Sequence, residues 1–265
     1  MIRARIITGA LLGGVLTAVV LLLPTAFTAT VLGALWIIGA WEWAGLARLA
    51  GGARLVYAGA CAACMLALLL VVDSQAARLI LGVALVGWAL ALVAVLSYPR
   101  KFSMATVGAA GFVALLPSWL LLVRLHDNAP LGRKLTMTLF LIVWAADIGA
   151  YTFGRWLGRI KLAPAVSPAK TWEGVSGGLA AAAAAAWAAA VWLGLPVGAL
   201  VLNGVATALV SVVGDLAVSA FKRNVGLKDT GSLLPGHGGV MDRIDSLTAA
   251  VPVFVLGLML AAIVR

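Results

Sequence analysis

The sequence predicts an all-α, polytopic integral membrane protein with about nine transmembrane helices. Of its 265 residues, 64% are hydrophobic and 11% are charged, and the mean hydropathy is +1.12. Soluble domains average roughly 45–50% apolar and about 25% charged residues. Apolar runs that approach the roughly 20 helical residues needed to cross a bilayer recur along the whole chain. This composition excludes a soluble globule, a disordered chain, a coiled coil and a secreted disulfide scaffold.

Nine apolar runs supply the predicted spans. They lie near residues 7–23, 27–47, 55–72, 78–97, 104–123, 135–154, 174–194, 197–221 and 246–264. Pro24 separates the first two runs, and Leu195-Pro196 separates the seventh from the eighth. No cleavable signal is evident, so the first run is predicted to be a retained span. The alanine-rich stretch at 180–190 is interpreted as packing, because small residues let membrane helices approach closely.

The basic residues indicate how these spans are oriented. With the N-terminus placed in the cytoplasm, 14 of the 19 Lys and Arg residues fall on the cytoplasmic side and 5 on the other. Cytoplasmic loops of membrane proteins carry an excess of Lys and Arg, so this bias predicts a cytoplasmic N-terminus and a C-terminus on the opposite side. The net charge of +10 then reflects topology and attraction to anionic membrane lipid, and a nucleic acid partner is not expected.

Acidic residues divide the chain into two regions. Residues 1–134 are nearly pure hydrophobic helix and are interpreted as a packing region, in which Glu42 contacts a neighbouring helix and Cys61 and Cys64 are small packing residues. Residues 135–265 hold six of the nine acids, all in the sixth or eighth span or in predicted cytoplasmic loops at 155–173 and 222–245. We therefore predict that the C-terminal region is catalytic.

The densest polar segment runs from Gly214 to Asp245. Asp215, Ser219 and Lys222 are spaced i, i+4, i+7 and so share one helical face. A carboxylate inside an apolar span is costly, which makes Asp215 a functional candidate. Carboxylates suit a hard divalent cation such as Mg²⁺, and a glycine-rich turn can cradle phosphate oxygens. Together with the Lys and Arg residues around them, these acids and glycines favour phosphoryl or nucleotidyl transfer over acyl chemistry.

A second polar segment runs from Trp144 to Gly174. Asp147, Tyr151 and Gly154 again fall on one helical face. Ser167-Pro168 is predicted to form a turn that starts the seventh span, where Lys170 and Thr171 can hold phosphate.

These residues carry a resemblance to a known family. The string S-x-F-K-R-x4-K-D-x-G-x2-L-P-G-H-G-G-V-x-D-R-I-D, from Ser219 to Asp245, resembles the signature of the phosphatidate cytidylyltransferases, or CDP-diacylglycerol synthases. Asp147, Tyr151 and the string SPAKTWEG resemble that family's second motif. The resemblance covers roughly the last half of the chain. It implies that CTP and phosphatidic acid react to give CDP-diacylglycerol and pyrophosphate with Mg²⁺, for which Mn²⁺ could substitute and to which a second cation could be added.

The resemblance also implies roles for individual residues. The metal-binding acids correspond to Asp215 and Asp242, with Asp245 close by. The catalytic set comprises Asp215, Lys222, Arg223, His237, Asp242 and Asp245. The substrate-binding set comprises Asp147, Tyr151, Ser167, Lys170, Thr171, Ser219, Lys228, Asp229, Gly238, Gly239 and Arg243. The expected location is the bacterial inner membrane with the site facing the cytoplasm, and the small-residue helices are compatible with a homodimer.

Plainer interpretations and other functions stay open on the sequence. Lys222-Arg223 could serve only to anchor topology, Lys228-Asp229 could be a solvated pair, and His237 could be an exposed turn residue. A CTP-dependent membrane kinase would transfer phosphate to an alcohol instead. A secondary transporter would use Asp147 and Asp215 as ion-coupling acids near the bilayer midplane.

Overall fold

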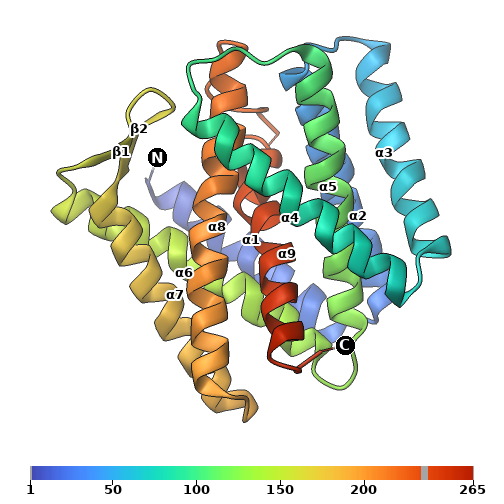
Figure 1. Ribbon diagram of the computed structural model, residues 1–265, viewed down its shortest axis with the longest axis vertical. Coiled ribbons are helices and arrows are strands. Elements are labelled where there is room, and N and C mark those ends of the chain that lie inside the picture. Colours follow the sequence, from blue (N-terminus) through green and yellow to red (C-terminus); the bar gives the residue numbers. More distant parts are fainter. Residues whose placement is uncertain (1, 234–237, 265) are drawn as a thin grey trace.

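The computed structural model describes residues 2–233 and 238–264, without the side chains of residues 2–8 and 10, and shows a helical bundle with one small hairpin (Figure 1). In chain order the described elements are α1 (Ile2–Leu22), α2 (Thr25–Leu46), α3 (Gly52–Val71), α4 (Ser74–Leu96), α5 (Met104–Asp127), α6 (Gly132–Leu157), β1 (Lys161–Ala163), β2 (Ser167–Thr171), α7 (Trp172–Leu193), α8 (Val197–Asn224) and α9 (Met241–Leu260).

Each predicted apolar run corresponds to one helix, which confirms the all-α multispan fold. Helices α2 to α9 are long and apolar enough to cross a membrane, and within the described part of α1 the apolar segment is the shorter Leu11–Leu22. Pro24 and Pro196 directly precede α2 and α8, as predicted. Proline suits helix starts, because its missing N–H would have no intrahelical acceptor there.

Two connections differ from the sequence prediction. The loop predicted at 155–173 contains an antiparallel hairpin, in which Lys161 pairs with Thr171 and Ala163 with Ser167. The predicted helix-start turn at Ser167 is therefore a strand, and α7 begins at Trp172. Its cap is Thr171, whose hydroxyl oxygen accepts a hydrogen bond from the Gly174 N–H at 3.2 Å. The last helix also begins earlier than the predicted residue 246, at Met241.

Connections predicted to be cytoplasmic gather at one end of the bundle. The Asn224 side chain accepts a hydrogen bond from the Phe102 N–H at 3.2 Å and donates to the Phe102 carbonyl at 3.1 Å. The Asn224 carbonyl accepts a hydrogen bond from Arg48, and Arg223 donates to the Val166 carbonyl in the hairpin. These contacts join four connections that are far apart in sequence, as the predicted alternation of spans requires.

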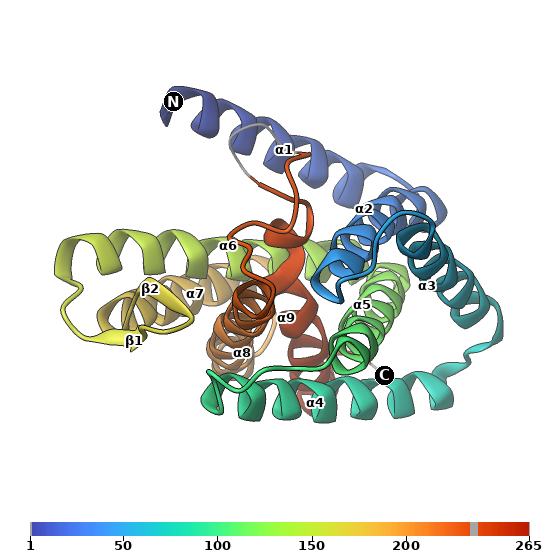
Figure 2. The same ribbon diagram turned by 90° about the horizontal axis from the view of Figure 1, so that it is seen from above.

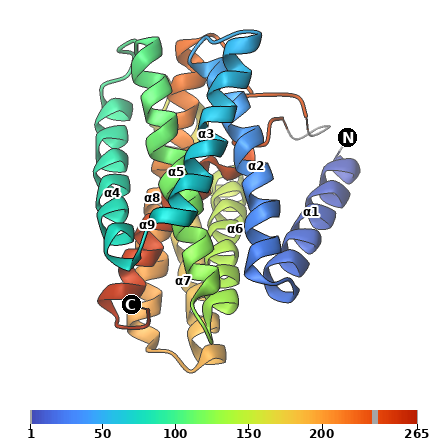
Figure 3. The same ribbon diagram turned by 90° about the vertical axis from the view of Figure 1, so that its right-hand side faces the viewer.

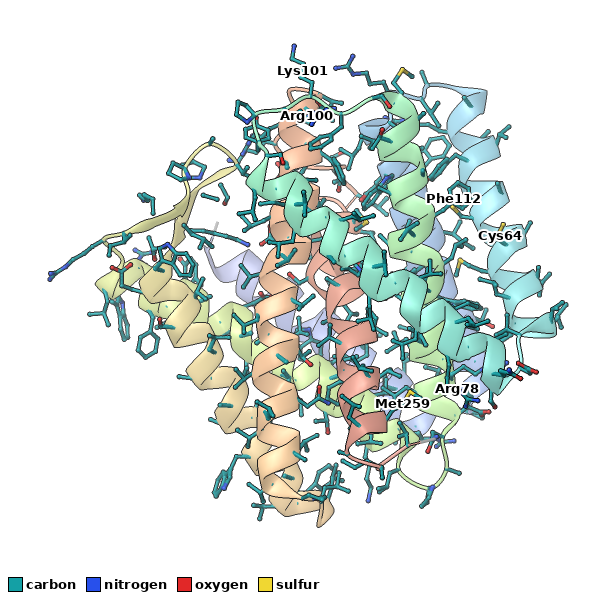
Figure 4. All side chains as sticks on the ribbon, in the orientation of Figure 1. Cys64, Arg78, Arg100, Lys101, Phe112 and Met259 are labelled. Atoms are coloured by element: carbon teal, nitrogen blue, oxygen red, sulfur yellow. The ribbon has the colours of Figure 1, made fainter. Side chains whose placement is uncertain are left out.

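The two ends of the bundle also differ in the residues that they carry. Figure 4 shows Arg100 and Lys101 at the end just described, while Arg78 lies at the other end. The termini point toward opposite ends as well (Figure 3). Which end faces the cytoplasm stays a prediction from the charge bias.

Helix α9 lies at the centre of the bundle, with α2, α5, α6 and α8 around it (Figure 2). Two thirds of its most apolar window, 67%, is buried, the largest share among the eight long apolar helices. Helix α4 lies obliquely across α5, α8 and α9, and α1 leans away from α2 on the other face (Figures 1 and 3). The N-terminal residues of α9 are thus surrounded by other helices, which lets several of them contribute to one site.

Small residues bring α6, α7 and α8 together. A Cβ atom at Gly178 would lie 2.8 Å from the Ala146 carbonyl oxygen, and one at Gly149 would lie 2.7 Å from the Gly177 carbonyl oxygen. A Cβ atom at Gly204 would lie 2.6 Å from that of Ala186, inside the alanine-rich stretch. Side chains larger than hydrogen cannot fit at these three glycines without moving the helices. The contact at Ala186 agrees with the interpretation of the alanine-rich stretch at 180–190 as a packing surface.

Candidate active site

A cavity of about 610 Å³ lies between α6, α7, α8, α9 and the hairpin strand β2. Its outer part includes Arg155, Lys170 and Arg243, which come from helix ends or the hairpin. Its inner part includes Leu179 and Ala208, which lie further inside the bundle. The cavity therefore carries its cations near the end of the bundle, while its inner part combines small and apolar side chains with the polar Asp147 and Ser211.

Asp215 makes two side-chain contacts at the cavity. Its carboxylate forms an ion pair with Lys170, with 2.6 Å between Nζ and Oδ2, and accepts a hydrogen bond from the Ser219 hydroxyl at 3.1 Å. The i, i+4 pairing of Asp215 and Ser219 was predicted and is confirmed. Asp147 and Asp245 also line the cavity and interact electrostatically with Asp215.

Close contact between α8 and α9 explains why Asp215 and Asp245 are neighbours. A Cβ atom at Gly214 would lie 2.6 Å from the Asp245 carbonyl oxygen and 2.8 Å from Cβ of Ala249. Glycine at position 214 therefore allows the two backbones to meet one residue before Asp215. The Asp245 side chain is buried at this crossing, where its Oδ1 accepts a hydrogen bond from the Ser246 N–H at 2.6 Å.

Asp242 is the centre of a second, adjacent cluster. It forms a buried ion pair with Lys222, with 2.8 Å between Nζ and Oδ1. Its other oxygen accepts hydrogen bonds from the Thr230 N–H at 2.9 Å and the Gly239 N–H at 3.0 Å, and it lies 3.0 Å from the Thr230 hydroxyl. Asp242 is not among the residues that line the cavity. Lys222 therefore pairs with Asp242 and not with Asp215, although Lys222 and Asp215 share a face of α8.

Glu42 joins this second cluster from the N-terminal region. Its buried carboxylate accepts hydrogen bonds from the Thr230 hydroxyl at 2.9 Å, the Val240 N–H at 3.1 Å and the Met241 N–H at 2.7 Å. The expected contact with a neighbouring helix is confirmed, because Met241 begins α9. Sequence reasoning nevertheless left Glu42 and Thr230 out of the site. The one sequence feature that could have indicated Glu42 is its position as an acid between Trp41 and Trp43 in an apolar run.

The remaining predicted site residues are distributed around these two clusters. Seven of the predicted residues line the cavity, namely Asp147, Tyr151, Lys170, Thr171, Asp215, Arg243 and Asp245. Ser167 lies in the hairpin outside the cavity lining, and Arg223, Lys228 and Asp229 are exposed. Gly238 has a φ of +81° and lies beside Asp242, in a backbone conformation that favours glycine. His237 lies outside the described residues.

Comparison with known proteins identifies the family to which the chain belongs. A model of the Cytidylyltransferase family matches residues 3–261. The chain belongs to the cytidylyltransferase family. It is 47% identical to a phosphatidate cytidylyltransferase of Pseudomonas aeruginosa, over 96% of each chain. It is 39% identical to one of Haemophilus influenzae, over 96% of this chain and 97% of the relative, and 42% identical to one of Brucella suis, over 79% and 73%.

Membership in the cytidylyltransferase family confirms the resemblance seen in the Ser219–Asp245 string. The match extends over both regions of the chain, so the N-terminal helices belong to the family fold as well. It favours nucleotidyl transfer over the alcohol kinase and the transporter, the two alternatives that the sequence left open.

The cavity of this cytidylyltransferase has oxygen ligands suited to a divalent cation. Mg²⁺ is commonly held by one or two carboxylates together with substrate phosphates. Asp215 and Asp245 supply two such carboxylates on adjoining helices. Within residues 2–233 and 238–264, no group of three or more His, Cys, Asp or Glu side chains is placed to hold a metal. The structure thus brings together two of the three predicted ligands and leaves Asp242 bound to Lys222 and Thr230.

Proposed function

We propose that this protein is a phosphatidate cytidylyltransferase, which transfers CMP from CTP to phosphatidic acid and releases pyrophosphate. The observation that carries the proposal is the cavity, because it brings charged and apolar side chains together, as a polyphosphate and a lipid bound in one space would require. Similarity to phosphatidate cytidylyltransferases over nearly the whole chain supports the same assignment.

The chemistry follows from the charges of the two substrates. A phosphate monoester has a second pKa near 6, so the phosphate of phosphatidic acid is largely a dianion at neutral pH. One of its oxygens attacks the α-phosphorus of CTP, and the bond from that phosphorus to the bridging oxygen breaks. The electron pair leaves with pyrophosphate. No proton has to be removed from the nucleophile, so His237 is not needed as a general base, and charge neutralisation and positioning dominate the rate enhancement.

The cations of the cavity are assigned to the CTP phosphates. Lys170 and Arg243 line the cavity, and Lys170 pairs with Asp215 in the described structure. A polyphosphate would compete with Asp215 for Lys170, leaving the carboxylate available to a metal ion. Arg223 lies at the exposed end of α8 and fixes the hairpin that carries Lys170, through its bond to the Val166 carbonyl. Lys222 acts behind the cavity by holding Asp242.

We assign a divalent cation, Mg²⁺ or Mn²⁺, to Asp215 and Asp245. Such an ion would neutralise phosphate charge while CTP is bound, and a second cation could join it. Asp242 could serve as the third predicted ligand only by giving up hydrogen bonds to Lys222, Thr230 or Gly239. We place the site at the cytoplasmic face of a bacterial inner membrane, where CTP arrives from the aqueous side and the lipid arrives laterally.

Labelled CTP tests the reaction type directly. Purified protein is incubated with phosphatidic acid, Mg²⁺ and CTP labelled at either the α- or the γ-phosphate. We expect α-label in the lipid fraction as CDP-diacylglycerol and γ-label only in released pyrophosphate. Label from the γ-phosphate in lipid would instead identify a kinase, and solute flux in sealed vesicles with no covalent product would identify a transporter.

Removal of divalent cations tests the metal assignment. We expect excess chelator to lower CDP-diacylglycerol formation at least tenfold, and added Mg²⁺ or Mn²⁺ to restore it, because two adjoining carboxylates repel a polyphosphate unless a cation lies between them. The measurement is initial rate against free metal concentration, with chelator saturated by Ca²⁺ as a control for effects of the chelator itself. Full activity in chelator would remove the metal from the proposal.

A further inference from the structure

Glu42 makes an unusual contact for a residue of the N-terminal region. It lies in α2, but all three of its hydrogen-bond donors belong to the segment that follows α8, which carries the family signature. Its partners are 188 to 199 residues away in sequence. Glu42 is only 5% exposed, so the carboxylate is held among protein groups.

Two of these bonds cap the N-terminus of α9. The first N–H groups of a helix have no intrahelical acceptor and carry a partial positive charge. Val240, at the N-cap position, makes no side-chain capping bond of its own. The N–H groups of Val240 and Met241 donate instead to Glu42, a carboxylate that comes from another helix. Such charge-assisted bonds are roughly twice as strong as bonds between neutral groups.

The third bond connects Glu42 to the Asp242 cluster. The Thr230 hydroxyl lies 2.9 Å from Glu42 Oε2 and 3.0 Å from Asp242 Oδ2. The single hydroxyl proton of Thr230 is thus shared between the two carboxylates, and this one side chain links them. Asp242 in turn holds Lys222 of α8, so a continuous set of polar contacts runs from α2 through the loop to α8 and α9.

Glycines around Glu42 fit this arrangement. A Cβ atom at Gly231 would collide with the Glu42 carboxylate, and one at Gly239 would collide with both Glu42 and Thr230. A Cβ atom at Gly39 would lie 3.0 Å from the Ile244 side chain, so α2 also approaches α9 closely one turn before Glu42. The Gly231 and Gly239 positions provide space for a carboxylate from α2, whereas the sequence analysis assigned Gly239 to substrate binding and gave Gly231 no individual role.

We propose that Glu42 is a positioning residue for the cytidylyltransferase site. By fixing Thr230 and the first turn of α9, it sets where Asp242, Arg243 and Asp245 lie relative to the cavity. The N-terminal region then contributes to catalysis through α2 as well as to packing. The inference rests on the proposed function, because it concerns the geometry of that same site.

A kinetic comparison of Glu42→Gln with wild type tests the proposal. Glutamine keeps the size of the side chain but removes its charge and presents a donor to other donors. We expect kcat to fall at least about tenfold, while KM for CTP changes less than about threefold, because small displacements of catalytic groups are costly for the chemical step. The rate is measured per folded, monodisperse protein, so a lower yield of folded protein does not count as support.

Asp73→Asn is the matched control, because Asp73 also caps a helix, α4, with its carboxylate. It lies at the other end of the bundle and should leave kcat unchanged. An unchanged kcat in folded Glu42→Gln protein would overturn the positioning role.

Hydrogen exchange gives a readout that does not depend on activity. We expect the backbone amides of Val240 and Met241 to exchange at least about tenfold faster in Glu42→Gln than in wild type, with no such change in Asp73→Asn. Equal exchange rates would overturn the inference even if kcat fell. If wild type made no CDP-diacylglycerol, the proposed function would fail, while the exchange rates would still decide whether Glu42 fixes this segment.

A second set of variants tests the same contact from the loop side, and its first member, Gly231→Ala, leaves Glu42 unchanged. Gly231→Ala keeps the Glu42 side chain, but the added methyl group would collide with the Glu42 carboxylate. We expect Gly231→Ala to lower kcat in the wild-type background and to have less than a twofold effect in a Glu42→Ala background. Equal effects in the two backgrounds would contradict the inference, because contacting groups should be non-additive.

Discussion

Replacing Asp215 with Asn should lower CDP-diacylglycerol formation by about a hundredfold or more, the loss typical of removing one electrostatic contact from a reacting centre. The amide keeps the shape of the side chain and can still accept the Ser219 hydrogen bond. It loses the charge that pairs with Lys170 and that we assign to the metal ion. The measurement is kcat at saturating CTP and Mg²⁺, on protein that elutes from size exclusion like wild type.

The loss must be separated from simple disruption of the Lys170–Asp215 ion pair. Both side chains are partly exposed, at 26% and 31%, so the pair itself contributes little to stability. We expect the double variant Lys170→Met/Asp215→Asn to remain as inactive as Asp215→Asn. Recovery in the double variant would show that an unpaired lysine caused the loss. Asp127 is the last residue of α5 and does not line the cavity. Asp127→Asn is therefore the control for removing a carboxylate and should keep wild-type activity.

The spans could be predicted from sequence because their cause is local. A bilayer core requires long apolar helices with internally satisfied backbone groups, so hydropathy alone locates them. The helix breaks at Pro24 and Pro196 follow from proline geometry. The shared face of Asp215 and Ser219 follows from helical periodicity in the same way.

The parts that sequence reasoning missed depend on distant partners. Strand β2 exists because Ser167–Thr171 pairs with Lys161–Ala163, and five residues carry too little periodicity to reveal it. Glu42 was identified as a helix contact, but its donors could not be named, because they lie about 190 residues away. No pattern within α2 indicates which loop supplies them.

Asp242 and Asp245 show where periodicity alone stops being sufficient. Their i, i+3 spacing places them on neighbouring positions of one helix face, as predicted for an early start of α9. Their surroundings differ, however: Asp245 lines the cavity beside Asp215, and Asp242 pairs with Lys222. A rotation of about 60° between neighbouring positions is enough to direct two carboxylates to different partners. The sequence predicts that Asp242 and Asp245 share a helix face, but the packing of α8 determines which partner each carboxylate contacts.

Asp242→Asn should therefore affect stability as well as activity. The Lys222 and Asp242 side chains are 11% and 7% exposed, so the variant leaves a buried ammonium group without its carboxylate. Breaking a buried ion pair from one side costs about 3–5 kcal/mol. We expect the free energy of unfolding in detergent to fall by about that amount, while CDP-diacylglycerol formation is lost. Lys101 is an exposed lysine at the same end of the bundle, and we expect the control variant Lys101→Met to change neither stability nor activity.

The double variant Lys222→Met/Asp242→Asn separates the two roles of Asp242. Removing both charges takes away the unpaired ammonium, so most of the lost stability should return, because a buried ion pair replaced by neutral groups often costs little. Activity should not return, since the substituted amide would still lack the charge that anchors Thr230 and Gly239 beside the cavity. If the single variant is as stable as wild type, the ion pair does not hold this segment, and a direct metal-ligand role for Asp242 becomes the better assignment.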